Sequence, residues 1–226
     1  MGVNRGVRTL PTLVADGDVQ MALDEELLAE AEEPTARRYL WVPATLSLGK
    51  FQRLPERSSD AQSLPIVRRP TGGRAVLHGD GFEWSFAVVV PRQAFTTESV
   101  GEPYDLVSGC LVRVLRHAGV PLDEGREAAY QRSALCFATA LRYDVLAGGE
   151  KVVALAQVRR RERVLVHGSV LERRPPETVV AQVEKIVGEP WRGQGLAGVG
   201  VELDGEEIFA HLVSCLAESL AGRSSA

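Results

Sequence analysis

The chain has 226 residues, of which 45% are hydrophobic and 25% charged, and its formal net charge is −4. This balance is typical of a globular protein with a sizeable core, and we expect a single domain over residues 1–226. The negative net charge, without a basic stripe interleaved with aromatic residues, argues against a nucleic-acid partner. No run of about 18 apolar residues occurs and the first 18 residues lack a secretion pattern, so we expect no membrane span and no export.

The three cysteines, Cys110, Cys136 and Cys215, lie far apart in the sequence and form no CxxC pair. This spacing fits a reducing cytoplasm and disfavours a zinc site, so we expect a cytoplasmic protein without a bound metal. Cys110 and Cys215 occupy apolar positions of expected helices, where a cysteine is usually a small buried hydrophobe. Because the number is odd, at least one thiol stays free of intrachain pairing.

Hydrophobic periodicity predicts an α+β architecture, a mixed β-sheet with packed helices. The first expected helix covers 18–33, with Asp18 as its N-cap. Three further helices are expected at 102–118, 176–187 and 203–221. The expected strands are 37–41, 44–48, 66–69, 73–78, 82–90, 143–146, 151–157 and 164–171. We expect a core over 18–172 followed by a helical C-terminal segment over 173–226.

Two adjacent glycines interrupt extended stretches between Arg68 and His78. Gly72 and Gly73 permit positive φ angles and let backbone N–H groups approach a ligand that a Cβ atom would block. A bare glycine pair is most often a tight turn. Here arginines, Thr71 and His78 flank the pair, which favours a ligand-binding loop.

Lysine is rare, since only Lys50, Lys151 and Lys185 are found among the 26 basic side chains. Lys151 lies between a glycine turn and two valines, where a compact ammonium can be directed at a carbonyl oxygen. The alternative is an ordinary lysine at a turn with its ammonium in water. Arginines gather at 159–163 and 173–174, either as a solvated turn and strand end or as a docking surface for an acidic protein.

Cys136 lies in a stretch with little helical or alternating regularity, which predicts a loop. A buried hydrophobe is the common role of a lone cysteine, but a loop position makes Cys136 the best nucleophile candidate. His78 and His167 each follow a strand-like run and are candidates for a base or for a residue that only satisfies a backbone group. GxSxG, Walker and HExxH motifs do not occur, which leaves serine hydrolases, P-loop nucleotidases and zincins unsupported.

Several segments resemble the lipoate and octanoate protein ligase and transferase family. Residues 69–78 and 83–86 are similar to its lipoate-binding loop and following strand. Residues 151–157 and 166–171 resemble two later motifs, while 21–25 and 43–52 resemble its first helix and first strands. The resemblance extends from about residue 18 to about residue 172.

This resemblance implies the α+β catalytic domain shared with biotin ligases, with the glycine loop bordering an acyl-chain tunnel. Cys136-Phe137 followed by Tyr143-Asp144-Val145 is similar to octanoyltransferases that carry their nucleophile at this place. Cys136 and Lys151 are therefore expected to be catalytic, with Lys151 at the acyl carbonyl. The implied substrate-binding residues are Arg69, Thr71, Gly72, Gly73, Arg74, Ala75, His78, Gln157, His167 and Gly168.

The implied reaction moves an octanoyl group from acyl carrier protein, through a Cys136 thioester, to a lysine of a lipoyl domain or of glycine cleavage H protein. Neither a cofactor nor a metal is expected. Alternatives are an octanoyl or lipoyl amidotransferase between H protein and lipoyl domains, an ATP-dependent lipoate ligase, and a non-catalytic acyl-binding protein. About 55 residues follow Leu171, fewer than the accessory domain of many ligases, which favours transfer.

The sequence also departs from the family pattern. Ala154 stands where a glycine is common and Leu155 where a small or polar residue is usual, which affects the expected acyl-chain preference. Residues 79–81 differ from the usual continuation after the binding loop and are closer to another octanoyltransferase branch, whose cysteine lies elsewhere.

Overall fold

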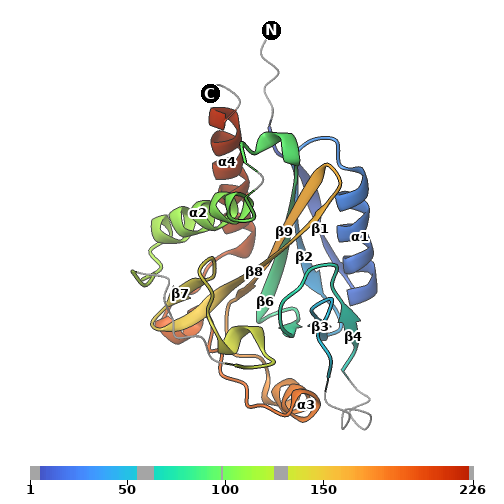
Figure 1. The fold of residues 1–226 in the computed structure, drawn as a ribbon. Coiled ribbons are helices and arrows are strands. Elements are labelled where there is room, and N and C mark those ends of the chain that lie inside the picture. The colour runs from blue at the N-terminus through green and yellow to red at the C-terminus, as the bar shows by residue number, and fades with distance from the viewer. Residues whose placement is uncertain (1–5, 55–63, 98, 125–131, 224–226) are drawn as a thin grey trace.

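The computed structural model describes residues 6–54, 64–97, 99–124 and 132–223. The strands form mixed sheets and α-helices pack against them, which confirms the α+β class (Figure 1). In chain order, with η for a 3₁₀-helix, the elements are β1 (Arg8–Ala15), α1 (Gly17–Glu30), β2 (Thr35–Trp41), β3 (Thr45–Leu48), β4 (Ile66–Arg68), β5 (Val76–His78), β6 (Glu83–Pro91), η2 (Arg92–Ala94), α2 (Gly101–His117), η3 (Cys136–Ala138), β7 (Val145–Ala147), β8 (Glu150–Arg160), β9 (Arg163–Leu171), α3 (Glu177–Val187), η4 (Leu196–Val199) and α4 (Gly205–Arg223).

The strands form two sheets. The larger sheet has the order β1-β2-β6-β9-β8-β7, and the smaller has the order β4-β3-β5. Among the strands of the described residues, β1 pairs with β2 and β3 with β4 in parallel, and the other neighbours are antiparallel. The long antiparallel ladder of β6, β9 and β8 forms the centre of the larger sheet.

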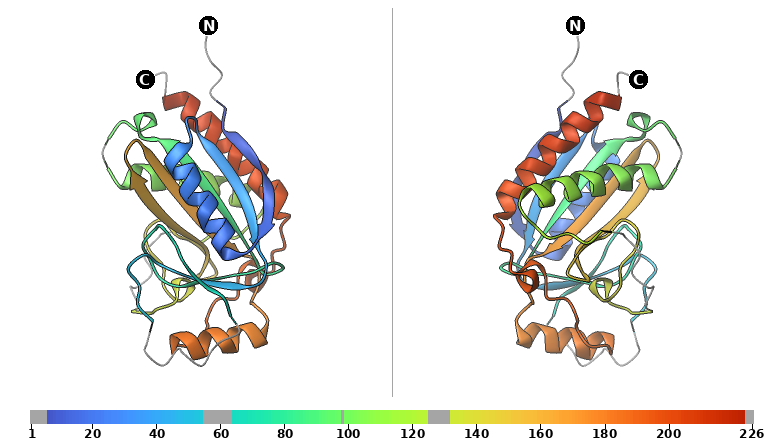
Figure 2. Two further views of the ribbon diagram at one scale, coloured as in Figure 1. Left: turned by 90° about the vertical axis from the view of Figure 1, so that its right-hand side faces the viewer. Right: turned by 90° about the vertical axis from the view of Figure 1, so that its left-hand side faces the viewer.

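Helices cover both faces of the larger sheet (Figure 2). α1 connects the parallel strands β1 and β2 and packs on one face, while α2 and α4 pack together on the other. The main apolar cluster lies under α2 and α4 and includes Phe86, Leu111, Val166 and Leu212, all fully buried. Within the described residues, no helix is both long and apolar enough to cross a membrane.

The first helix begins earlier than the sequence indicated. Asp16, not Asp18, is the N-cap, because its side chain accepts a hydrogen bond of 2.9 Å from the Val19 N–H. The buried positions of α1 include Met21, Asp24 and Leu28, which follow the helical repeat. The face that α1 turns to the sheet is therefore partly polar.

One strand was missed. β1 was not predicted, because this edge strand contains Pro11 and has no regular alternation of buried and exposed side chains. The two helices expected after Leu171, at 176–187 and 203–221, are found as α3 and α4, and residues 188–195 and 200–204 between them contain no α-helix. α4 contributes Leu212 and Leu216 to the main apolar cluster.

The interpretation of Cys110 and Cys215 as unpaired hydrophobes is also corrected. The two residues form a disulfide that joins α2 to α4, while Cys136 is free. Both were placed correctly on apolar helix positions, but these positions face each other across the contact between the two helices. The pairing was hidden because 105 residues separate the cysteines in the sequence.

The disulfide predicts the number of reactive thiols. Unfolded without reductant, the protein should react with one equivalent of a thiol reagent, at Cys136, and with three equivalents after reduction. Intact-protein mass spectrometry after alkylation counts the adducts, and a Cys110→Ala variant is the control that frees Cys215. Three adducts on the unreduced wild type would contradict the pairing.

Candidate active site

A pocket of about 260 Å³ lies over the α1 face of the larger sheet. Its floor follows from the strand register, since Ala154 is opposite Ser169, Ser169 is opposite Ser85, and Ser85 is opposite Tyr39. This row crosses β8, β9, β6 and β2. The pocket is lined by Met21, Tyr39, Trp41, Arg69, Gly73, Arg74, Val76, His78, Ser85, Cys136, Thr139, Leu141, Asp144, Lys151, Ala154, Leu155, Ala156, His167, Gly168 and Ser169.

The backbone joins the glycine loop to the segment that carries Cys136. Ala75 donates from its N–H to the Ala134 carbonyl at 2.9 Å, and Cys136 donates to the Ala75 carbonyl at 2.8 Å. These bonds form a short parallel bridge between Ala75 and Leu135. The glycine loop and the cysteine segment are about 60 residues apart in the sequence. These bonds therefore hold them side by side at the pocket.

Lys151 points its ammonium at the cysteine. Its Nζ lies 2.7 Å from the Cys136 carbonyl oxygen, 3.5 Å from Cys136 Sγ and 2.7 Å from Asp144 Oδ2. These three acceptors match the three N–H groups of an ammonium. Only 2% of the Lys151 side chain is exposed, so burial of its charge requires the Asp144 carboxylate.

Asp144 is itself held in place from two sides. Its Oδ2 accepts from the Leu141 N–H at 2.7 Å, and its Oδ1 accepts from the Leu155 N–H at 3.2 Å. The carboxylate thus ties the segment after η3 to strand β8. Its position fixes Lys151, and through Lys151 it fixes Cys136.

Arg69 organises the glycine loop. Its guanidinium donates to the Ser47 carbonyl and hydroxyl and to the carbonyls of Gly72 and Arg74, at 2.7 to 3.3 Å. Gly73 has φ +96°, which a residue with a Cβ adopts at a cost, and a Cβ on Gly49 would overlap the Gly73 carbonyl. Burial lowers the pKa of Arg69 to about 10, which leaves it charged at neutral pH.

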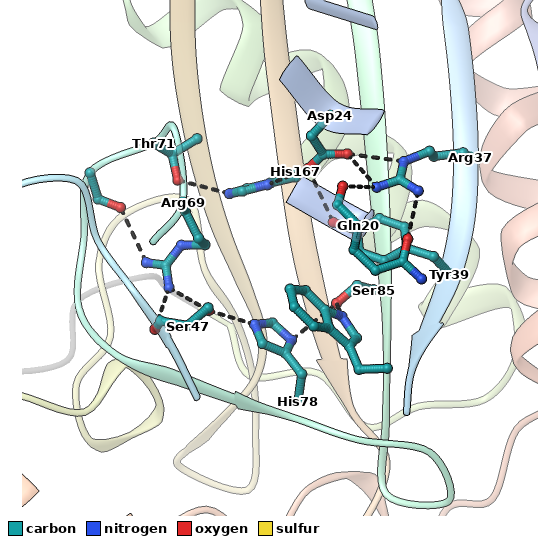
Figure 3. Close-up of polar contacts among 12 residues, drawn as sticks. Gln20, Asp24, Arg37, Tyr39, Ser47, Arg69, Thr71, His78, Ser85 and His167 are labelled. Carbon is teal, nitrogen blue, oxygen red and sulfur yellow. Dashed lines mark hydrogen bonds and ion pairs between the residues drawn. The ribbon is translucent and has the colours of Figure 1, made fainter. Parts of the chain in front are cut away.

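Asp24 is the hub of a buried network behind the loop (Figure 3). It binds Arg37 at 2.7 Å and His167 Nδ1 at 3.0 Å, and His167 Nε2 lies 2.8 Å from the Thr71 hydroxyl. Burial alone would raise the pKa of Asp24, but Arg37 and His167 outweigh it and hold that pKa below its ordinary value.

His167 is uncharged in this network, because burial lowers its pKa more than Asp24 raises it. An ionised Asp24 only accepts, so Nδ1 carries the proton and Nε2 accepts from the Thr71 hydroxyl. Both ring nitrogens are thus occupied. His167 holds the loop through Thr71 and has no free nitrogen to take a proton from Cys136.

His78 is held in a second network (Figure 3). Its Nε2 lies 2.7 Å from the Ser47 hydroxyl and its Nδ1 lies 3.1 Å from Glu83, while its ring stacks on Trp41 with centroids 4.1 Å apart. Ser85 accepts from Trp41 Nε1 and donates to Glu83. These contacts place His78 in the pocket wall.

Eight of the twelve site residues expected from the sequence line this pocket: Cys136, Lys151, Arg69, Gly73, Arg74, His78, His167 and Gly168. Thr71, Gly72 and Ala75 lie behind it and support it through the bonds described above. Gln157 is not among the lining residues, because its side chain instead donates to the Val100 carbonyl at 2.8 Å. Ala154 and Leu155, the two departures from the family pattern, both line the pocket.

Sequence reasoning missed the carboxylates that orient the site. Asp24 shares the helical face of Met21 and Leu28, and this spacing was the available signal. Asp144 precedes an apolar strand and carried no signal apart from its place in the family-like segment. Within the described residues, His, Cys, Asp and Glu side chains form no group of three that would hold a metal ion.

Comparison with known proteins identifies the family. Residues 16–187 match the model of the lipoyl protein ligase A/B catalytic domain. This match covers most of the chain, so the protein belongs to the lipoyl protein ligase A/B catalytic domain family.

The curated relatives of this chain include octanoyltransferases named LipM. The chain is 39% identical over 168 residues to octanoyltransferase LipM of an Exiguobacterium strain, a match that covers 66% of this chain and 60% of the relative. It is also 39% identical over 190 residues to octanoyltransferase LipM of Kyrpidia tusciae, covering 77% and 69%. The matches thus span about 60% of the length of the first of these relatives.

Solved structures share the fold. Lipoate-protein ligase A bound with ATP superposes with a TM-score of 0.72 at 20% identity, covering 96% of this chain and 86% of that one. A bi-partite lipoate protein ligase from Thermoplasma acidophilum gives 0.63 at 20% identity, covering 96% and 84%. A biotin protein ligase from Aquifex aeolicus gives 0.56 at 14%, covering 95% and 70%.

The buried His167 predicts a pH dependence of stability. Below about pH 6.5 the unfolded chain binds a proton at this position that the folded chain excludes, so stability present above that pH is lost as pH falls. The free energy of unfolding should fall by up to about 1.4 kcal/mol per pH unit from this group. Urea unfolding between pH 5 and pH 8 measures it.

In His167→Asn the side-chain amide still donates to Asp24 but does not titrate. The contribution of His167 to the pH dependence of the free energy of unfolding should therefore disappear. His211→Asn, at an exposed position of α4, is the matched control for loss of a histidine. An unchanged slope in His167→Asn would show that His167 is not held neutral in the fold.

Proposed function

We propose that this protein is an octanoyltransferase that works through an acyl thioester on Cys136. One observation carries the proposal: the only free cysteine lies in the pocket wall, with the Lys151 ammonium 3.5 Å from its sulfur. All three cysteines lie in the described residues. The likeness to octanoyltransferases LipM supports the same reaction.

The first step is attack by Cys136 Sγ on the carbonyl carbon of an octanoyl thioester carried by acyl carrier protein. A bond from carbon to Sγ forms, the bond to the carrier sulfur breaks, and the thiol proton of Cys136 passes to the departing sulfur. One thioester replaces another, so this step is nearly isoenergetic. The acyl chain lies along the row of Ala154 and Ser169 on the pocket floor.

Lys151 acts both before and after the sulfur bonds to the acyl carbon. Before attack, its third N–H points at Sγ. Once Sγ is bonded to the acyl carbon it is a poor acceptor, and the same N–H turns to the carbonyl oxygen that becomes negative in the tetrahedral intermediate. The other two N–H groups stay on Asp144 and the Cys136 carbonyl, so little reorganisation is needed.

The second step gives a stable product. A lysine amine of a lipoyl domain or of glycine cleavage H protein attacks the acyl carbon, an amide bond forms, the bond to Sγ breaks, and Sγ regains a proton from the amine. An amide is more stable than a thioester, which draws the reaction forward. Neither step uses ATP.

Acylation of Cys136 is expected without ATP. Intact-protein mass spectrometry after incubation with octanoyl acyl carrier protein should show one octanoyl adduct, removable by hydroxylamine, on the wild type and none on Cys136→Ala. Modification of a lipoyl domain only when ATP and free acid are supplied would instead make the protein a ligase. An adduct of equal extent on Cys136→Ala would place the acyl group on another residue.

Asp144→Asn should slow acyl-enzyme formation about a hundredfold, because Lys151 loses the charge that aims it at Cys136. The half-saturating concentration of the thioester should change little, since Asp144 acts through Lys151. Rapid-quench mass spectrometry separates the two quantities. Asp123→Asn is the matched control, because the Asp123 carboxylate caps the adjacent turn, where it accepts from the N–H groups of Gly148 and Gly149. Equal rates for the two variants would remove Asp144 from the mechanism.

A further inference from the structure

Charge is distributed unevenly around the pocket. Three segments, 49–54, 64–78 and 132–143, contain no Asp or Glu, although the whole chain carries 30 acidic residues and a net charge of −4. Together they hold seven basic residues: Lys50 and Arg53 in the first, Arg68, Arg69 and Arg74 in the second, and Arg132 and Arg142 in the third.

Contacts place these segments at one rim. Segment 49–54 touches the other two, because Lys50 donates from its N–H to the Thr71 carbonyl at 2.8 Å and Gln52 donates to the Ala134 carbonyl at 2.9 Å. Gly73 and Leu141, from the second and third segments, are exposed and line the pocket. β3, which directly precedes the first segment, and β4, which belongs to the second, lie side by side at one end of the molecule (Figure 1).

Five of the seven cations are exposed, and we call them the basic collar: Lys50, Arg53, Arg68, Arg132 and Arg142. Among the described residues, none of the five forms an ion pair with a carboxylate. Arg68 donates to the backbone carbonyls of Gly49, Lys50 and Gln52, all in segment 49–54. Glu189 also reaches this rim, but its carboxylate accepts from the Ser133 hydroxyl and the Ala134 N–H.

An exposed apolar side chain lies beside one of these cations, since the Lys50 ammonium is 5.6 Å from the centre of the Phe51 ring. Phe51 is 83% exposed, the largest exposure among the large hydrophobic residues of the described chain, and Leu141 is 57% exposed at the pocket wall. An exposed aromatic side chain next to exposed cations is typical of a protein contact with an apolar anchor and a charged rim.

We propose that the basic collar is the docking surface for the acyl donor, an acidic protein that delivers its acyl group as a thioester on a flexible arm. The inference rests on the proposed function for the identity of the cargo. Complementary charge draws the acidic carrier to the rim and raises the rate of encounter, and the arm reaches past Leu141 to Cys136. The arginines at 159–163 and 173–174 are not part of this surface, since Arg160, Arg173 and Arg174 pair with Glu25, Glu202 and Glu177.

The test compares two donors on the full chain: octanoyl acyl carrier protein and octanoyl-pantetheine, which carries the same thioester without the protein. The variants are Lys50→Glu/Arg53→Glu and Arg142→Glu, with Arg116→Glu in an exposed position at the end of α2 as the control. Acyl-enzyme formation is followed by intact mass at low and at physiological salt.

For the double variant, the second-order rate constant with the carrier protein should fall about tenfold at low salt and change less than twofold with octanoyl-pantetheine. The wild-type rate with the carrier should fall as salt is raised, and that of the variant should not. Equal losses with both donors, no loss with either, or a loss confined to transfer onto the lipoyl domain would each overturn the proposal.

Failure of the proposed function gives a different result. If the wild type forms no acyl-enzyme from either donor, binding of fluorescently labelled acyl carrier protein tests independently whether the basic collar is a docking surface. Anisotropy should then show binding to the wild type and to Arg116→Glu, and weaker binding to the double variant. Absence of binding to the wild type would reject the collar as a docking surface.

Discussion

The buried ion pair of Lys151 and Asp144 is the constraint on which the site depends. It joins strand β8 to the segment after η3, and it keeps an ammonium in a place with almost no solvent. Arginine serves at nearly every other basic position of this chain, but its flat, forked group does not match three acceptors arranged around one atom. The ion pair thus accounts for a lysine here and for the orientation of Cys136, whose carbonyl and sulfur take the remaining two N–H groups.

The glycine loop is fixed by a separate set of buried charges. Arg69 donates to the loop carbonyls of Gly72 and Arg74. Thr71 is bound by His167, which in turn is bound by Asp24 of α1. Asp24 also binds Arg37, so α1, β2, β9 and the loop meet at one carboxylate. His167 is neutral and both of its nitrogens are hydrogen-bonded, so it fixes the position of Thr71 and does not transfer protons. In the proposed reaction, protons pass directly between the reacting sulfur atoms and the amine.

Much of this arrangement could be predicted from the sequence. Periodicity gave the α+β class and the main helices, and the scarcity of lysine together with the loop position of Cys136 singled out two residues that the fold then brings together. What periodicity missed depends on partners remote in sequence: the edge strand β1 is defined by its pairing with β2, and the disulfide by the packing of α2 on α4. Asp24 and Asp144 look like ordinary acidic residues until their buried partners are known.

Kinetic competence of the acyl-enzyme decides whether the acyl group passes through Cys136. The octanoylated protein would be isolated free of donor, mixed with an apo lipoyl domain, and sampled in a single turnover by rapid-quench mass spectrometry. We expect transfer of the octanoyl group from Cys136 to the lipoyl lysine to be at least as fast as steady-state turnover. Transfer much slower than turnover would show that the thioester is a side product and that the reaction follows another route.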